Sequence, residues 1–353
     1  MIDPNDVDGC IQYALRIVQQ AALLARRVQA EAGKNHPMVS PAISKSDRSP
    51  VTVADFAIQA IVACRLMEAF PTDPLVAEED SSALKDSPLL EQVTGFVSGL
   101  EPAANPQSVC EWIDRGNARA GVGVGAGSEP APTTHAPTRY WLLDPIDGTK
   151  GFLRGGQYAV ALALMVDGQA QVGVLGCPEL GGAGGSLVYA VRGRGTWIMP
   201  LEGVVRVNST RGIRPYSRLR VSGRTNPAQA RLLRSFEAGH TNVDQIEQFA
   251  ATLGIQAKPV LMDSQVKYAV LAAGQGDLML RLLSPENPNY REKAWDQAAG
   301  SLVVEEAGGR ASDLDGKPFD FTLGRELIHN RGVLVSNGRL HEAALLALKT
   351  IGA

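Results

Sequence analysis

The sequence predicts a protein built from an α+β half followed by an α/β half. The chain has 353 residues, which is too long for one ordinary small core. Three β-rich runs at 158–166, 170–177 and 187–193 are separated by Asp-Gly or glycine clusters, which predicts a meander of antiparallel strands. After this meander, short strands alternate with helices to the end of the chain. We therefore expect an N-terminal domain at 1–205 and a C-terminal domain at 206–353.

Two long helices are expected before the meander. The first is predicted near residues 8–31, where apolar side chains recur on one face and Gly33 follows as a C-cap. The second begins at Thr52, and Asp55 has the spacing of a capping-box variant. Pro71 closes this helix.

The remaining segments complete the expected order of elements. Residues 74–80, PLVAEED, predict a short buried strand that runs into three acids. Residues 116–138 are rich in Gly, Ala and Pro, so we expect an exposed insertion there. In the second half, helices are expected at 227–237, at 242–253 and, as the last element, at 338–350.

Charge and composition narrow the class of partner. The formal net charge is -3 and the isoelectric point is near 6.0, so no overall basic field favours a nucleic-acid polymer or an anionic membrane. No run approaches the ~20 apolar residues of a membrane span. The first ten residues lack the features of a signal or transit peptide. We expect a soluble intracellular protein, cytoplasmic by default, while a trimmed chloroplast or mitochondrial protein would look the same.

The four cysteines are widely scattered and form neither a CxxC motif nor a metal-ligand spacing. Reduced thiols in a reducing compartment are the expected state. Sequence spacing leaves open whether two of the sulfurs form a redox-sensitive pair. The residues concerned are Cys10, Cys64, Cys110 and Cys177.

The acids of the stretch WLLDPIDGTKGF, residues 141–152, raise an energetic question. Asp144 and Asp147 lie at the mouth of what reads as a buried strand, where carboxylates repel and are costly unless a cation neutralises them. Other acids also lie at element ends, and each alone has an ordinary reading as a cap or a solvated residue. A cluster of them fits a hard cation, Mg²⁺ foremost, and the lack of His and Cys argues against zinc. These other acids are Asp47, Glu78, Glu79, Asp80 and Asp296.

Three segments make the chain resemble a known superfamily. In chain order, AEED, DPIDGTKGF and KAWDQAAGSLVVEEAGG are similar to the signature segments of the inositol monophosphatase superfamily. The resemblance implies a layered α-β-α-β-α sandwich of the sugar-phosphatase type and a Mg²⁺-dependent, lithium-inhibited phosphomonoesterase. Within the superfamily, KSDRSPVTVADFAIQA, DGTKGFLRGGQYAVALAL, DSQVKYAVLAAG and YREKAWDQAAG resemble the 3'(2'),5'-bisphosphate nucleotidases of plants and yeast.

The resemblance implies a role for each matched residue. The metal ligands, for two or three Mg²⁺, would be the carboxylates of Glu78, Asp144, Asp147 and Asp296 with the carbonyl of Ile146. Asp47 and Thr149 would activate the attacking water, and the backbone N–H groups of Gly148 and Thr149 would hold the phosphate that is cleaved. The substrate's second phosphate and nucleoside would be bound by His240, Ser264, Lys267 and Arg281, and Asp296 would also contact the substrate. Two roles stay open for Lys293: it neutralises a nearby acid, or it is only a solvated residue of a helix.

The implied reaction is hydrolysis of adenosine 3',5'-bisphosphate to AMP and phosphate, with the 5'-phosphosulfate analogue as a second substrate and a place in sulfur assimilation. The implied partner is this small molecule alone, and family habit favours a monomer. The runner-up is inositol 1,4-bisphosphate as substrate, and a non-catalytic sensor of phosphonucleotides is a third reading. Two departures bear on substrate preference: Gly156 stands where relatives often carry an acid, and Asn242-Val243 lacks their second histidine.

Overall fold

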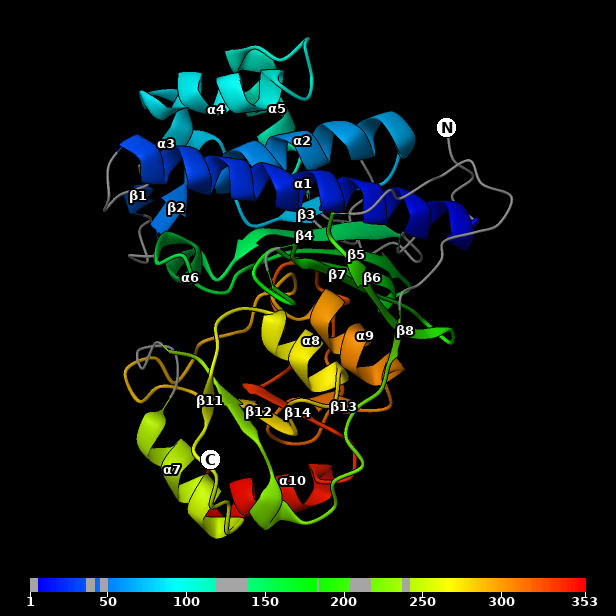
Figure 1. Cartoon of the computed structure of the whole chain (residues 1–353), viewed down its shortest axis with the longest axis vertical. Helices are drawn as coiled ribbons and strands as arrows, with labels where there is room; N and C mark the ends of the chain where they lie inside the picture. Colours follow the sequence, from blue (N-terminus) through cyan, green and yellow to red (C-terminus); the bar gives the residue numbers. More distant parts are fainter. Residues whose placement is uncertain are drawn as a thin grey trace, which may run out of the picture.

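The computed structural model shows five alternating layers of helix and sheet (Figure 1). It describes residues 6–35, 42–44, 50–118, 139–182, 184–202, 217–236 and 242–353. From one end to the other, the layers are a pair of long helices, a seven-stranded sheet, a second helix pair, a five-stranded sheet and a last helix pair. This order confirms the expected α-β-α-β-α sandwich. No helix among the described residues is long and apolar enough to cross a membrane.

The first layer consists of α1 (Val7–Asn35) and α2 (Val53–Ala69), and the two helices follow the apolar patterns expected of them. The backbone N–H of Ala54 donates to the Thr52 hydroxyl at 3.1 Å, and Asp55 accepts from the Thr52 N–H at 2.8 Å, which confirms the capping box. Helix α2 is buried almost all round because it packs against α1, the sheet and two outer helices. The shorter outer helices are α3 (Ser82–Lys85), α4 (Leu89–Ser98) and α5 (Pro106–Asp114).

The seven-stranded sheet follows sequence order, β3-β4-β5-β6-β7-β8-β9. Strand β3 pairs with β4 in parallel, and every other pair is antiparallel, as the meander predicts. The strands are β3 (Leu75–Ala77), β4 (Tyr140–Asp147), β5 (Ala159–Val166), β6 (Gln169–Cys177), β7 (Ser186–Val191), β8 (Gly195–Pro200) and β9 (Ser217–Leu219).

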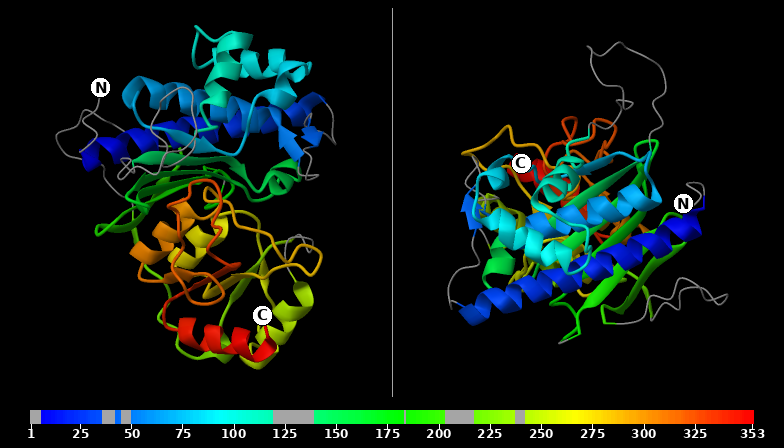
Figure 2. Two further views of the ribbon diagram at one scale, coloured as in Figure 1. Left: turned by 180° about the vertical axis from the view of Figure 1, so that it is seen from behind. Right: turned by 90° about the horizontal axis from the view of Figure 1, so that it is seen from above.

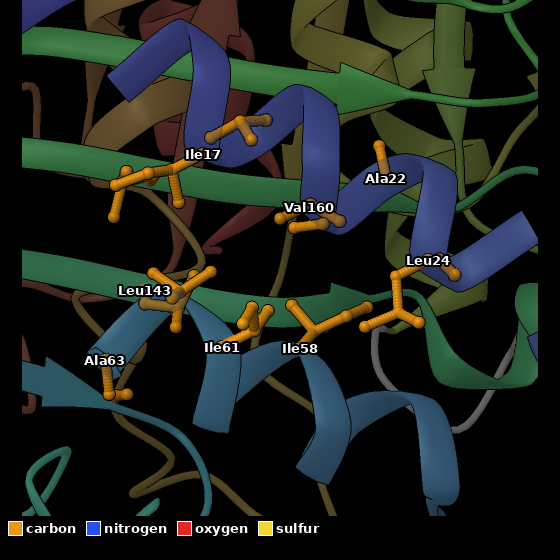
Figure 3. Packing of buried hydrophobic residues seen from close by; sticks show 14 of the residues in the cluster. Ile17, Ala22, Leu24, Ile58, Ile61, Ala63, Leu143 and Val160 are labelled. Atoms are coloured by element: carbon orange, nitrogen blue, oxygen red, sulfur yellow. The ribbon is translucent and has the colours of Figure 1, made fainter. Parts of the chain in front are cut away.

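An apolar core joins this sheet to the first helix layer. Side chains of α1, such as Ile17, and of α2, such as Ile58 and Ile61, meet Leu143 of β4 and Val160 of β5 (Figure 3). All of these side chains are buried. Burying one such side chain stabilises a fold by roughly 1.5–3 kcal/mol, so this core fixes β4, and the acids at its end, firmly in place.

The second half packs on the opposite face of the sheet. Helices α8 (Val266–Ala272) and α9 (Ala298–Glu306) form the middle layer, and α9 packs against β5, β6, β7 and β8. The five-stranded sheet lies beyond them in the order β11-β10-β12-β14-β13. Its strands are β10 (Leu232–Arg234), β11 (Val260–Leu261), β12 (Leu278–Arg281), β13 (Arg310–Ser312) and β14 (Val333–Ser336), and α7 (Val243–Thr252) and α10 (His341–Ile351) cover its outer face.

One expected element is wrong. The structure replaces the helix expected at 227–237 by a single 3-10 turn, η1 (Pro227–Gln229), and the strand β10. Leu232 and Leu233 are buried between the neighbouring strands β11 and β12. The leucines and arginines of this segment favour a helix locally, but burial in the sheet outweighs that weak preference.

Several expectations fall outside the described residues. A short ladder between β1 (Ala42–Ser44) and β2 (Pro50–Thr52) flanks the loop that carries Asp47, which itself lies outside them. The same holds for His240 and for residues 119–138 of the expected insertion. The expected domain boundary at 205/206 also lies in such a stretch, 203–216, and it stays a prediction.

Candidate active site

The turn after β4 is the centre of the candidate site. Its leading residues, Trp141 to Leu143, are buried in the core, and the pairing of β4 with β5 shifts register between Asp144 and Asp147. Pro145 lies inside this shift and has no N–H to donate to a ladder. The irregular pairing lets both carboxylates leave the strand close together, as the motif predicts.

Gly148 turns the chain from β4 into the short helix α6 (Thr149–Leu153). Its φ of 87° is in the left-handed region, and a Cβ at this position would lie 2.9 Å from the Cβ of Ser264. The Thr149 hydroxyl donates to the Ile146 carbonyl at 3.2 Å. The turn therefore brings Ile146, Gly148 and Thr149 to the same side as Ser264, a residue of the second half.

Glu78 reaches the same place from the neighbouring strand. Parallel pairing aligns Ala77 of β3 with Leu143 of β4, so Glu78 and Asp144 follow equivalent positions at one edge of the sheet. Gln59 of α2 fixes the chain just beyond: its amide donates to the Glu79 carbonyl at 2.6 Å and accepts from the Glu79 N–H at 3.0 Å. The buried Gln59 thus sets the direction in which the chain leaves β3.

Asp296 joins from the second half, two residues before the first residue of α9, rather than inside the helix. Arg281 of β12 lies beside it, with the guanidinium 3.6 Å from an Asp296 carboxylate oxygen. The same guanidinium donates to buried Glu292 at 3.0 Å and to the hydroxyl of Tyr290 at 3.1 Å. Burial opposes the charge of Arg281, but the charges of Glu292 and Asp296 outweigh it, so its pKa is raised and it stays a cation.

The four carboxylates interact through their charges. Burial, followed by the charges of Glu78, Asp147 and Asp296, raises the pKa of Asp144 well above its ordinary value. Burial and the charge of Asp147 raise the pKa of Asp296 to about 8, with Arg281 opposing. These effects require the acids to lie within electrostatic reach of one another. Asp144 is buried and the other three acids are half-buried, so ionising all four together is costly unless a cation neutralises them.

Ser264 and Gln265 connect the two halves at this point. Ser264 has a φ of 64°, a left-handed conformation that a non-glycine residue adopts only under constraint. The Gln265 N–H then donates to Asp147 Oδ2 at 2.6 Å, and the Gln265 side chain donates to the Trp295 carbonyl at 3.1 Å. One residue thus holds Asp147 and the chain next to Asp296.

Lys267 supplies a second cation. It is half-buried on α8, and its ammonium donates to the Ser235 hydroxyl at 3.0 Å. Burial lowers its pKa, and the charge of Asp147 opposes that shift. Lys267, Arg281, Ser264 and the acids therefore lie around one place.

Arg325 is a residue of the site region that the sequence did not indicate. Its guanidinium donates to the Ala77 carbonyl at 2.9 Å and to the Gly116 carbonyl at 3.1 Å. It also lies 4.8 Å from the ring centroid of Trp295, next to Asp296. Arg325 therefore joins the residue before Glu78 to the residue before Asp296. It comes from a loop far along the chain and belongs to no motif, whereas Gln59 had a signal, a polar residue within an apolar helix.

The donor set at this place fits a hard cation. Asp144 Oδ1 is buried and has no hydrogen-bond partner among the described residues. The nearby thiol of Cys177 is fully buried, and burial and the charge of Asp147 raise its pKa, so it stays neutral and is not a metal ligand. The remaining candidate ligands are all oxygens. Carboxylates from four positions and one carbonyl are the oxygen donors that suit a hard cation such as Mg²⁺.

Elsewhere in the described part of the chain, one group of potential ligands lies closer together. Atoms of Cys64, Glu68 and Glu101 are all within 4.8 Å of one another. Arg65 already pairs with Glu68 at 3.1 Å and with Glu101 at 2.8 Å. Arg65 therefore already supplies a positive charge to both carboxylates of this group. The four acids of the candidate site are spaced more widely than this group.

Comparison with known proteins decides the family. The inositol monophosphatase family profile matches residues 9–352. The chain belongs to the inositol monophosphatase family. Its fold agrees with solved members: a Thermotoga maritima IMPase has a TM-score of 0.63 at 19% identity and covers 97% of this chain and 98% of its own, and CysQ from Bacteroides thetaiotaomicron has a TM-score of 0.58 at 17% identity, covering 94% and 98%.

Several similar sequences share the name of one enzyme within this family. A 3'(2'),5'-bisphosphate nucleotidase of Emericella nidulans is 37% identical over 359 residues, which are 95% of this chain and 96% of the relative. The enzyme of the same name from Schizosaccharomyces pombe is 36% identical, covering 96% and 95%. The one from Oryza sativa is 37% identical, covering 95% and 93%. The resemblance to the plant and yeast nucleotidases is thereby confirmed.

Proposed function

We propose that this family member is a Mg²⁺-dependent phosphomonoesterase that hydrolyses the 3'-phosphate of adenosine 3',5'-bisphosphate to give AMP and phosphate. The observation that carries the proposal is similarity over nearly the full length to nucleotidases of fungi and a plant. The 5'-phosphosulfate analogue, which has the same 3'-phosphate, is proposed as a second substrate. The mutual repulsion of these acids, which raises the pKa of Asp144 and of Asp296, supports the metal requirement.

The proposed ligands of two or three Mg²⁺ are the carboxylates of Glu78, Asp144, Asp147 and Asp296 with the Ile146 carbonyl. Bound there, Mg²⁺ supplies charge neutralisation and a lowered pKa for water. The protein side chains do the rest. Gln265 holds Asp147 with its backbone N–H, and Arg281 stabilises the charge of Asp296.

Thr149 is proposed to hold the attacking water through its hydroxyl. In the structure this hydroxyl donates to the Ile146 carbonyl, so its proton already has an acceptor and its lone pairs are directed away from that bond. We propose that Asp47, which lies outside the described residues, accepts a hydrogen bond from the Thr149 hydroxyl when a water is bound, so that the hydroxyl oxygen can accept from the water. The backbone N–H groups of Gly148 and Thr149 are proposed to hold the phosphate that is cleaved.

Lys267 and Arg281 are proposed to bind the 5'-phosphate, with Ser264 and His240 nearer the sugar. Arg281 is engaged with Glu292 and Tyr290, so its charge is fixed in place before any substrate arrives. Lys267 has one hydroxyl partner and keeps donors for an anion. We therefore expect loss of Lys267 to weaken nucleotide binding, and loss of Arg281 to affect both binding and Asp296.

Phosphate release tests the proposal. Purified protein with Mg²⁺ is given adenosine 3',5'-bisphosphate, its 5'-phosphosulfate analogue and inositol 1,4-bisphosphate in parallel assays, and kcat/KM is measured for each. Higher kcat/KM for the nucleotides supports the proposal, and a higher value for inositol 1,4-bisphosphate contradicts it. The Asp147→Ala variant separates an enzyme from a sensor, because an enzyme loses turnover and a sensor has no turnover to lose.

A further inference from the structure

Phe236 is the only aromatic among the large apolar side chains that the described part of the chain leaves exposed. It follows β10 and is 54% exposed, whereas the others in this group are aliphatic. Isolated aliphatic side chains on a surface need no explanation, but an aromatic ring presents a large flat face that interacts with other flat groups. Whether this ring can contact a substrate therefore depends on where it lies relative to the candidate site.

Arg154 and Asp263 hold Phe236 in place. The Arg154 guanidinium lies over the ring, 5.5 Å from its centroid, and also pairs with the carboxylate of Asp263. Asp263 also accepts from the Phe236 backbone N–H at 3.4 Å. Asp263 is buried, so this ion pair is anchored in the protein. The ring is supported by a cation on one face, and more than half of its surface is left for another partner.

The supported ring lies at the edge of the candidate site. Ser235, the residue before it, accepts from Lys267, which we propose binds the 5'-phosphate. Asp263, which holds its backbone, is followed by Ser264 and by Gln265, whose N–H donates to Asp147. Phe236 thus follows the residue that holds Lys267, a proposed phosphate contact, and is connected through three consecutive residues, 263–265, to the proposed metal ligand Asp147.

We propose that Phe236, supported by Arg154, is a stacking platform for the nucleobase of the substrate and selects a nucleotide over an inositol phosphate. The inference rests on the proposed function and adds a residue for substrate specificity. Every base has a flat π-face that stacks on an aromatic ring, whereas an inositol ring is saturated and has none. A platform of this kind discriminates between the two substrates without touching the reacting phosphate.

Kinetics of two substitutions tests the platform. Phe236→Ala should lower kcat/KM for adenosine 3',5'-bisphosphate about tenfold relative to kcat/KM for inositol 1,4-bisphosphate, mainly through a higher KM for the nucleotide, because stacking on one aromatic ring is worth about that much. Phe236→Trp, which keeps a flat ring, should restore the ratio. The matched control is Leu346→Ala, which removes another exposed apolar side chain on α10, far along the chain.

An unchanged ratio in Phe236→Ala would overturn the platform, as would equal losses in the alanine and tryptophan variants. Arg154→Gln should change the same ratio less, about threefold, since it removes the support and not the ring. In this variant, a fall in kcat without a rise in the nucleotide KM would contradict a role in positioning Phe236.

A binding measurement separates this inference from the proposed function. AMP is titrated into the wild-type protein and Phe236→Ala by calorimetry with Mg²⁺ present. If the wild type hydrolyses no nucleotide but binds AMP about tenfold more tightly than Phe236→Ala, the proposed function fails and the platform stands. If both proteins bind AMP equally, or neither binds it, the platform fails, whatever the phosphatase assay shows.

Discussion

The two halves of the molecule contribute to the site in opposite ways. The N-terminal half brings three acids, Glu78, Asp144 and Asp147, at the edge of a sheet whose strands pair in sequence order. The C-terminal half brings one acid, Asp296, together with the cations Lys267 and Arg281. The first half thus concentrates negative charge on rigid backbone, and the second supplies the positive charge that an anionic substrate needs.

The connections between the halves show why this division works. A buried apolar layer between the seven-stranded sheet and helices α8 and α9 joins them. Polar bonds then align the site within this layer: Gln265 donates to Asp147, Arg325 to Ala77, and Tyr140 to the Phe321 carbonyl at 2.6 Å. Apolar burial holds the halves together without specifying direction, whereas these directed bonds set where the four acids meet.

The largest expected loss of activity comes from neutralising an acid of the N-terminal half. Asp144→Asn removes a proposed ligand, so we expect kcat to fall by on the order of 10³-fold, since metal stabilisation of charge is worth several kcal/mol. Without metal, the same change should stabilise the fold, because burial and neighbouring acids raise the pKa of Asp144 and make its ionised form costly. Phosphate release and thermal unfolding in EDTA measure the two effects.

The exposed Asp315→Asn variant is the control for that experiment, since Asp315 pairs with Arg331 and is not among the proposed metal ligands. It should leave kcat unchanged. A fully active Asp144→Asn enzyme, or one whose metal-free form unfolds at a lower temperature than wild type, would contradict the account.

Breaking a directed bond between the halves should have a smaller effect. Arg325→Met keeps the bulk of the side chain but loses the donors to Ala77 and Gly116, so Glu78 and Asp296 are no longer held in register. We expect Mg²⁺ affinity and kcat/KM to fall about 10–100-fold, as for other residues that orient metal ligands. Calorimetric titration with Mg²⁺ measures the first and phosphate release the second.

Arg325→Lys should recover part of the loss, since it keeps the charge but not the two-pronged geometry. Arg310→Met removes an exposed arginine that pairs with Glu342 and serves as the matched control. Equal Mg²⁺ affinity in wild type and Arg325→Met would show that apolar packing alone sets the site.

The smallest expected effect is a loss of stability at acid pH that originates in the C-terminal half. His341 lies buried in the C-terminal half between the hydroxyls of Ser312 and Ser336, and burial lowers its pKa to about 4. The unfolded chain has the higher pKa, so His341 stabilises the fold fully above about pH 6.5 and loses that contribution as the pH falls toward 4. The loss should be on the order of 2 kcal/mol.

Denaturant unfolding between pH 7 and pH 4 tests this, with His341→Asn as comparison. The variant should lose less stability than the wild type over that interval. If the two proteins lose the same free energy of unfolding, His341 is not the group that titrates.

Much of the fold was readable from the sequence where the pattern is local. The strand meander follows alternating turns, and Thr52 with Asp55 begins α2 as its capping-box spacing predicts. The segment 227–237 was read as a helix because its residues favour one locally, whereas Leu232 and Leu233 are buried in a sheet that forms from distant strands. Local preference cannot reveal pairing partners that lie elsewhere in the chain.

The candidate site also contains residues that the sequence predicts and residues that only the structure reveals. Asp144 and Asp147 were found from their place at the end of an apolar strand, and the family resemblance supplied the other expected residues. Gln265 donates its own backbone N–H to the Asp147 carboxylate, and Arg325 donates to a backbone carbonyl of another segment; no side-chain spacing marks such bonds. Arg325 contacts a residue 248 positions away, a distance over which sequence periodicity carries no information.

The central claim is that acids from both halves bind the same cations. Calorimetric titration of Mg²⁺ into the wild type and Asp296→Asn tests it most directly, with thermal unfolding to show that both proteins are folded. The account predicts that Asp296→Asn binds Mg²⁺ at least about tenfold more weakly, although every acid of the N-terminal half is intact. Unchanged Mg²⁺ affinity and stoichiometry in Asp296→Asn would show that the N-terminal half binds the metal alone, and would contradict the claim.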